Sequence, residues 1–125
     1  MSEAPTFSVV IPCYNYGRYL TATIKSVLEQ GREDVEIILI DDASTDNTSE
    51  IAAKFQHQIT YIRNKKNQGA GGAWRTGIAK ASGTFVLKLD ADDKLLPGHF
   101  DRVASAFETD HEIGLVATSV LIYRE

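Results

Sequence analysis

Short apolar segments alternate with amphipathic segments along most of the chain. The apolar segments are rich in β-branched residues and have the length of buried strands; they are Phe7–Ile11, Val35–Ile40, Ile59–Ile62, Thr84–Leu89 and Gly114–Ile122. The amphipathic segments predict helices; they are Gly17–Gln30, Thr45–Phe55, the stretch after Gln68–Gly72 that carries Trp74 and Ile78 on one face, and a stretch that opens near Pro97. Because apolar strands alternating with helices are typical of covered parallel sheets, the pattern predicts a doubly wound α/β fold, mostly parallel, with helices on both faces.

The composition narrows the class of protein without identifying a chemistry. The chain has 125 residues, of which 43% are hydrophobic and 24% charged, and a net charge of -4, which suits a single domain over residues 1–125. It has no apolar run of the ~20 residues that cross a membrane. Its one cysteine, Cys13, excludes an internal disulfide and a multi-cysteine zinc site. Mild acidity disfavours a nucleic-acid partner, so we expect a cytoplasmic domain without a membrane segment.

Three of the predicted strands are followed by residue types that bind ligands. They are Pro12–Asn15 after the first strand, Asp41-Asp42 after the second and Asp90–Asp93 after the fourth. The carboxyl ends of parallel strands share one edge of the sheet, where such folds bind their ligands. Carboxylates gathered on that edge repel one another unless a cation lies between them, and Mg²⁺ or Mn²⁺ prefers oxygen ligands and phosphates. The edge therefore predicts a phosphorylated ligand held through a metal; for Asp90–Asp93 the alternative is a polar turn ahead of Pro97.

The remaining candidate residues are less specific. Tyr14 is either a packed aromatic side chain or a face for a nucleobase, with Asp42 accepting a hydrogen bond from a base N–H. The glycine-rich stretch Gln68–Ala73 matches neither the dinucleotide motif nor the P-loop, and we interpret it as letting a helix start close to the sheet. Asn64–Lys66 is interpreted as a solvated loop, with a phosphate contact as the alternative, and Cys13 as a small buried residue.

Several short motifs follow one another in a specific order. They are I-P-x-Y-N at Ile11–Asn15, I-D-D-x-S-x-D at Ile40–Asp46, N-x-G at Asn67–Gly69 and S-G-x-F-V-x-x-L-D-x-D-D at Ser82–Asp93, followed by Pro97. Each motif alone is weak, and the set in this order and spacing is specific. From about Phe7 to Ile122 the chain resembles the N-terminal half of a family-2 glycosyltransferase of the GT-A fold.

The resemblance implies a nucleotide-binding role for the first two strand ends. In such enzymes the Pro-x-Tyr-Asn segment, here Pro12, Tyr14 and Asn15, flanks the base of the donor nucleotide. The second aspartate of the acidic pair, here Asp42, reads that base, which is usually uracil. The resemblance therefore implies a nucleotide-diphosphate sugar as donor, with UDP as the expected nucleotide.

The resemblance also implies a metal site in the Asp-x-Asp motif. Asp90 and Asp92 would serve the ribose and the metal–diphosphate, with Asp92 as the direct ligand of Mn²⁺ or Mg²⁺. The metal would bridge the diphosphate to the acidic edge and stabilise charge on the leaving group. The implied reaction is inverting transfer of the sugar to an acceptor hydroxyl on a saccharide, a lipid carrier or a protein.

The chain departs from the family pattern in two respects. Trp74 stands where members usually carry arginine, and Arg75 follows one position later, so the contacts of that arginine are not transferred and Trp74 is expected to pack. The acceptor-binding half and the general base of an inverting mechanism have no counterpart in the motifs. We expect that base beyond Glu125, in a longer enzyme whose full length could associate with a membrane.

Two alternatives remain open on the sequence alone. A receiver-type phospho-acceptor signalling domain has a similar size and an acidic pair, but its pair follows the first strand, whereas Asp41-Asp42 follows the second. A nucleotide-binding module without catalytic activity fits the same motifs.

Overall fold

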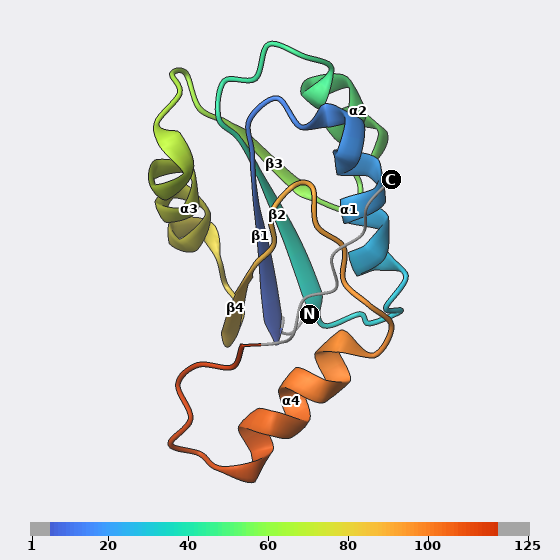
Figure 1. Ribbon diagram of the computed structural model, residues 1–125, viewed down its shortest axis with the longest axis vertical. Coiled ribbons are helices and arrows are strands. Elements are labelled where there is room, and N and C mark those ends of the chain that lie inside the picture. The colour runs from blue at the N-terminus through green and yellow to red at the C-terminus, as the bar shows by residue number, and fades with distance from the viewer. Residues whose placement is uncertain (1–5, 118–125) are drawn as a thin grey trace.

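A parallel sheet runs through the centre of the computed structural model, which describes residues 6–117 (Figure 1). Its four strands are β1 (Phe7–Cys13), β2 (Val35–Asp41), β3 (Thr60–Arg63) and β4 (Phe85–Lys88), in the order β3-β2-β1-β4. The helices are α1 (Gly17–Leu28), α2 (Thr48–Lys54), α3 (Gly69–Lys80) and α4 (His99–Thr109). All the strand pairings are parallel, and the predicted doubly wound α/β fold is confirmed.

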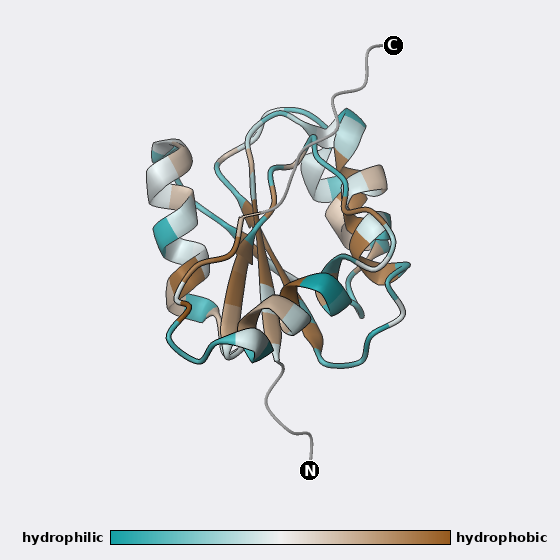
Figure 2. Ribbon diagram, turned by 60° about the horizontal axis from the view of Figure 1, so that its bottom comes forward, coloured by the Kyte–Doolittle hydropathy of each residue, from teal (hydrophilic) through white to brown (hydrophobic). Residues whose placement is uncertain are grey.

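Helices cover both faces of the sheet because successive strand residues point to opposite sides. Val10 and Ile38 belong to a buried cluster on the face covered by α3. Their neighbours Val9 and Ile37 belong to a larger cluster with side chains of α1, α2 and α4. Figure 1 shows α3 on one side of the sheet and α1 with α2 on the other, and Figure 2 shows the strands as a hydrophobic centre. A side chain at Gly77 would collide with Val10, so glycine allows α3 to pack this closely.

The first strand is longer than the sequence predicts. Pro12 predicts an end at Ile11, but β1 continues through Pro12 to Cys13 and pairs with β2 over its whole length. Pairing with β4 ends at Val10. The missing N–H of Pro12 therefore leaves no ladder bond to β4 unmade, which is the condition under which a sheet tolerates proline.

The second helix is shorter than the sequence predicts. It begins at Thr48 and not at Thr45. The N–H groups of Thr45 and Asp46 donate instead to Oδ1 of Asn15, at 2.8 and 3.3 Å. A loop contact across the edge of the sheet thus takes the place of the first helical turn.

The chain after β4 differs most from the prediction. α4 begins at His99, after Gly98 with a φ of 79°, and not at Pro97. Within the part of the chain that the structure describes, residues 114–117 of the predicted fifth strand pair with no other strand, and Leu115 is 85% exposed. The remainder of that prediction, residues 118–122, lies outside the described residues. Between residues 6 and 117, no helix has the length and hydrophobicity needed to cross a membrane.

Candidate functional site

A cavity of about 660 Å³ opens at the carboxyl edge of the sheet, where the loops after β1, β2 and β4 meet the start of α3. Its lining residues are Pro12, Cys13, Tyr14, Asn15, Tyr16, Asp42, Asn67, Gly69, Ala70, Ala73, Lys88, Asp90, Ala91 and Asp92. All the site residues that the sequence predicts are in this set: Pro12, Tyr14, Asn15, Asp42, Asp90 and Asp92. The fold therefore brings together segments that are far apart in the sequence.

The loop after β1 presents the ring of Tyr14 to the cavity and is anchored by hydrogen bonds of Asn15. Tyr14 is 47% exposed at the cavity, so its ring is accessible to a planar ligand. Asn15 has a left-handed backbone with a φ of 57°, which asparagine tolerates better than most residues. Its Oδ1 accepts hydrogen bonds from the N–H groups of Thr45 and Asp46, and its own N–H donates to Ser44 Oγ at 3.1 Å. The side chain of Asn15 thus ties the β1 loop to the β2 loop.

Asp46 adds a second link between the same loops. Its Oδ2 accepts a hydrogen bond from the N–H of Gly17, the first residue of α1, at 2.9 Å, and its Oδ1 accepts one from the N–H of Thr48, the first residue of α2, at 3.0 Å. Burial raises the pKa of Asp46, but the hydrogen bonds from Thr48 and Gly17 outweigh it and lower the pKa below its ordinary value. The carboxylate therefore holds the starts of two helices beside the cavity.

Asp42 lines the cavity, and hydrogen bonds from the protein fix the position of its carboxylate. It is 2% exposed, and its Oδ1 accepts hydrogen bonds from Asn64 Nδ2 and from the N–H of Gln68, both at 2.9 Å. These bonds occupy both lone pairs of Oδ1, so Oδ2 is the oxygen left for a ligand. The expectation that Asn64 is part of a solvated loop is wrong, because this side chain is buried against Asp42.

Asp41, by contrast, is fully buried, and its charge is satisfied inside the protein. Its Oδ1 accepts a hydrogen bond from the N–H of Ser44 at 2.8 Å, and its Oδ2 accepts bonds from the Tyr61 hydroxyl and from Arg63 Nη1, the latter at 2.8 Å. Burial and the bond to Asp41 raise the pKa of Tyr61 to about 12, which keeps the phenol protonated. Asp41 does not line the cavity. The expectation that all the aspartates share one open edge is therefore wrong for this residue.

The sequence did not reveal Tyr61 and Arg63, the two residues whose side chains donate to the buried carboxylate of Asp41. They lie two residues apart on β3, so they point to the same side of the sheet. Arg63 stands opposite Asp41 in the β2–β3 register. The available signal was a basic residue at the end of a short strand, which becomes informative only once that strand is known to lie beside β2.

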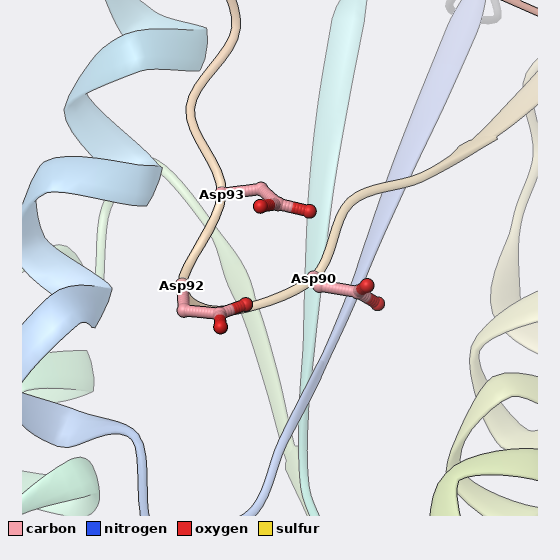
Figure 3. A group of neighbouring side chains, drawn as sticks. All are labelled: Asp90, Asp92 and Asp93. Carbon is pink, nitrogen blue, oxygen red and sulfur yellow. The ribbon is translucent and has the colours of Figure 1, made fainter. Parts of the chain in front are cut away.

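The loop after β4 carries three exposed carboxylates (Figure 3). Leu89 and Ala91 are buried, whereas Asp90, Asp92 and Asp93 are exposed. One carboxylate oxygen from each aspartate lies within 4.8 Å of the other two. Burial and the charges of Asp92 and Asp90 raise the pKa of Asp93. The loop therefore concentrates negative charge that the protein itself does little to neutralise.

These carboxylates fit a hard divalent cation in donor type and in spacing. An ion such as Mg²⁺, with oxygen ligands at about 2.1 Å, brings neighbouring ligands to roughly 3 Å of one another, so oxygens within 4.8 Å could reach one ion by rotation of these exposed side chains. In the described part of the chain, their one ion-pair partner is Lys88, whose Nζ is 3.6 Å from Asp90 Oδ1. Both side chains of that pair are exposed, so its energy is small. Asp90 and Asp92 could hold a cation that faces the cavity.

Two expectations about packing are confirmed. Cys13 is 2% exposed, and burial raises the pKa of its thiol, so it is not an activated nucleophile. Trp74 packs against the cluster that contains Val10 and Ile40, and it does not line the cavity.

Comparison with known proteins identifies a family. The model of Glycosyl transferase family 2 matches residues 8–125. An uncharacterized glycosyltransferase of Nostoc sp. (strain PCC 7120) is 42% identical over 113 residues, which cover 87% of this chain and 35% of that protein. The chain spans less than half the length of the curated relatives it matches.

Solved structures share the fold. Residues 1–349 of S. aureus TarS, in complex with UDP-GlcNAc, match with a TM-score of 0.79 and 29% identity over 85% of this chain and 32% of that one. The mannosyltransferase PcManGT of Pyrobaculum calidifontis, in complex with GDP-Man and Mn²⁺, matches with a TM-score of 0.72 and 26% identity over 86% of this chain and 32% of that one. These matches leave the receiver-domain alternative without support. The chain belongs to glycosyl transferase family 2 and has the GT-A fold.

Proposed function

We propose that this chain binds a nucleotide-diphosphate sugar, with UDP as the nucleotide, and that it holds the diphosphate through a divalent cation at Asp92 and Asp90. The sugar would then pass to an acceptor hydroxyl. The observation that carries the proposal is that one cavity of about 660 Å³ is lined by Tyr14, by Asp42 and by the acidic loop, as we call Asp90–Asp93, through its residues 90–92. UDP-GlcNAc on TarS, and GDP-Man with Mn²⁺ on the mannosyltransferase, are ligands of this class.

The surroundings of Asp42 favour uracil over guanine. Uracil presents one ring N–H donor between two carbonyls, whereas guanine presents two adjacent N–H donors that match both oxygens of a carboxylate. Oδ1 of Asp42 is occupied by Asn64 and Gln68, so the remaining oxygen matches a single donor. The exposed ring of Tyr14 provides a surface on which the base can stack.

The acidic loop suits a diphosphate only with a cation present. When bound, Mn²⁺ or Mg²⁺ supplies the positive charge that offsets the carboxylates and stabilises the leaving diphosphate. Without it, the diphosphate meets Asp90, Asp92 and Asp93 as like charges, which opposes binding. Asp90 shares its carboxylate with Lys88 at 3.6 Å, so Asp92 is the better candidate for the direct ligand and Asp90 for the ribose or a second metal contact.

Inverting transfer also needs a base within hydrogen-bonding reach of the acceptor hydroxyl. The residues proposed here have other roles, since Asp42 faces the nucleobase and Asp90 and Asp92 face the metal. We place the base beyond Glu125, because the chain spans less than half the length of its curated relatives. The acceptor, whether saccharide, lipid carrier or protein, would be bound there too.

The proposal is tested by thermal unfolding and calorimetric titration with UDP, GDP and Mn²⁺, in the unmodified chain and in Asp92→Asn. At a hundredfold excess over Kd, UDP with Mn²⁺ should stabilise the chain by about 2.7 kcal/mol, which raises Tm by roughly 10 °C. Asp92→Asn should lose the Mn²⁺-dependent part of this shift. Glu108→Gln, an exposed residue on α4, is the charge-matched control and should keep it.

Two outcomes would count against the proposal. Absence of binding at millimolar UDP and Mn²⁺ would contradict it as a whole. Equal affinity for GDP would contradict the assignment of uracil, while leaving the metal site intact. A transfer assay with a UDP-sugar, run on this chain and on one extended beyond Glu125, then separates an enzyme from a module that binds the donor without reacting: the proposal expects transfer by the extended chain alone.

A further inference from the structure

The loop between β4 and α4 obtains hydrogen-bond partners from one face of α1. Residues 89–98 contain no helix or strand, so their peptide groups depend on partners elsewhere. Three polar side chains provide such partners: Thr23 and Ser26 on α1, and Gln30 just after its end. Their spacing of three and four residues places them on one side of the helix.

Thr23 contacts the acidic motif directly. It is 0% exposed, and its hydroxyl donates to the carbonyl oxygen of Ala91 at 2.8 Å. Ala91 lies between Asp90 and Asp92, and its carbonyl belongs to the peptide unit that precedes Asp92, so this bond orients the backbone between the two aspartates. The same hydroxyl lies 3.2 Å from the carbonyl of Tyr19, the usual partner of a threonine inside a helix. The contact with Ala91 is the shorter of the two.

Ser26 and Gln30 hold the rest of the loop. Ser26 Oγ accepts a hydrogen bond from the N–H of Leu95 at 3.0 Å. Gln30 Nε2 donates to the carbonyl oxygen of Leu96 at 2.9 Å, and its Oε1 accepts a bond from the N–H of His99 at 3.1 Å. The chain is therefore held by α1 from the acidic motif to the first residue of α4.

We propose that Thr23 is a positioning residue for the metal site, supported by Ser26 and Gln30: by holding the Ala91 carbonyl, it sets the spacing of the Asp90 and Asp92 carboxylates before any ligand binds. The inference rests on the proposed function for its biological meaning. Leu89 is anchored by its buried side chain and by its N–H, which donates to the Val10 carbonyl at 3.0 Å, and Ala91 adds a buried methyl group. Without the hydroxyl, a buried carbonyl loses its partner, and the loop must move to find another. Metal sites lose affinity when the groups that orient their ligands are removed.

The test compares two substitutions at one position. Thr23→Val keeps the shape of the side chain and removes the hydroxyl, whereas Thr23→Ser keeps the hydroxyl. In Mn²⁺ titrations in the presence of UDP, Thr23→Val should weaken binding roughly tenfold, and Thr23→Ser should stay within about twofold of the unmodified chain. Ser8→Ala is the control, because Ser8 is equally buried but bonds to Glu36 and to the N–H of Gly83, which precedes β4 at the end opposite to the acidic loop.

A second measurement needs no ligand. The N–H of Asp93 donates to the carbonyl of Asp90 at 3.0 Å, and the N–H of Leu95 donates to Ser26. In the free protein, hydrogen exchange at these amides, followed by NMR, should be roughly tenfold faster in Thr23→Val than in Thr23→Ser, because the buried bond that restrains the loop is lost.

The outcomes separate this inference from the proposed function. Where the unmodified chain binds Mn²⁺ with UDP, the titration decides: equal affinities of Thr23→Val and Thr23→Ser overturn the inference, and so does an equal loss in Ser8→Ala. Where the unmodified chain binds no Mn²⁺, the proposed function fails and hydrogen exchange decides. Faster exchange in Thr23→Val then supports the positioning of the loop, and unchanged exchange overturns it.

Discussion

The acidic pair at the end of β2, Asp41 and Asp42, and the acidic loop after β4 have the same kind of charge in opposite surroundings. Asp41 and Asp42 are 0% and 2% exposed, and both accept hydrogen bonds from the protein. Asp90, Asp92 and Asp93 are exposed, and their oxygens lie within 4.8 Å of one another. The protein provides partners for Asp41 and for one oxygen of Asp42, whereas among the described residues the second group has one ion-pair partner, Lys88.

The position of each strand in the sheet explains this difference. β2 lies between β1 and β3, so donors from neighbouring segments surround its end, among them Tyr61, Arg63 and Asn64. Within residues 6–117, β4 pairs with β1 alone, and α1 reaches the backbone of its loop but not the carboxylates. An aspartate at the end of a strand is thus bound by the protein where a neighbouring strand supplies hydrogen-bond donors, and it stays accessible to ligands where none does.

The largest expected effect is on the buried group. Asp41→Asn should lower the free energy of unfolding by about 3 kcal/mol, because the buried site loses charge-assisted hydrogen bonds from Tyr61 and Arg63 and turns an amide N–H toward donors. Asp92→Asn, the same change in the exposed loop, should alter it by less than about 0.5 kcal/mol. Urea unfolding of both variants measures the difference. An equal loss of stability in the two variants would contradict the view that the protein depends on the charge of Asp41 and not on that of Asp92.

Asp42 is expected to show an intermediate effect, because it is buried and also faces the cavity. In Asp42→Asn the carbonyl oxygen can still accept from Asn64 and Gln68, but an N–H group replaces the acceptor that faces the base. We expect about tenfold weaker binding of UMP, or about 1.4 kcal/mol, with a smaller loss of stability than in Asp41→Asn. Calorimetry without metal measures it, with Asp92→Asn as the control that keeps UMP affinity. Unchanged UMP affinity in Asp42→Asn would separate this residue from base recognition.

The smallest effects are those of pH. Burial raises the pKa of Asp46, but hydrogen bonds from Thr48 and Gly17 lower it on balance, whereas burial and the charges of Asp92 and Asp90 raise that of Asp93. Asp46 therefore contributes stability above its ordinary pKa of 3.8, and this is lost as the pH falls through its lower folded pKa. Asp93 acts in the opposite sense. Because its pKa is raised, its protonation as the pH falls relieves the repulsion from Asp92 and Asp90 and increases stability.

Both side chains are exposed, so each contributes at most a few tenths of a kcal/mol, about as much as a surface pair. An NMR titration of the carboxyl carbons checks the assignment. Asp46 should titrate below 3.8 and Asp93 above it. The reverse order would contradict the difference between the two regions.

The sequence by itself determined the fold class, the family and the residues that gather at the cavity. Apolar strands and amphipathic helices can bury their faces together only as a covered sheet, and the carboxyl ends of parallel strands share one edge whatever the strand order. Tyr14, Asp42 and Asp92 could therefore be placed together from their positions after strands. The ends of elements were less certain, as at Pro12, because they depend on which neighbour a strand has at that point.

Only the tertiary structure decided which carboxylates are free and what holds them. Asp41 and Asp92 have similar local sequences, but the bond from Tyr61 to Asp41 spans 20 residues and the bond from Thr23 to Ala91 spans 68. Such partners are set by strand register and by the packing of helices on the sheet, which the local pattern of apolar and polar residues does not specify. An aspartate whose charge is compensated inside the fold and one that stays exposed therefore differ in their neighbours in space, and not in the residues beside them in the chain.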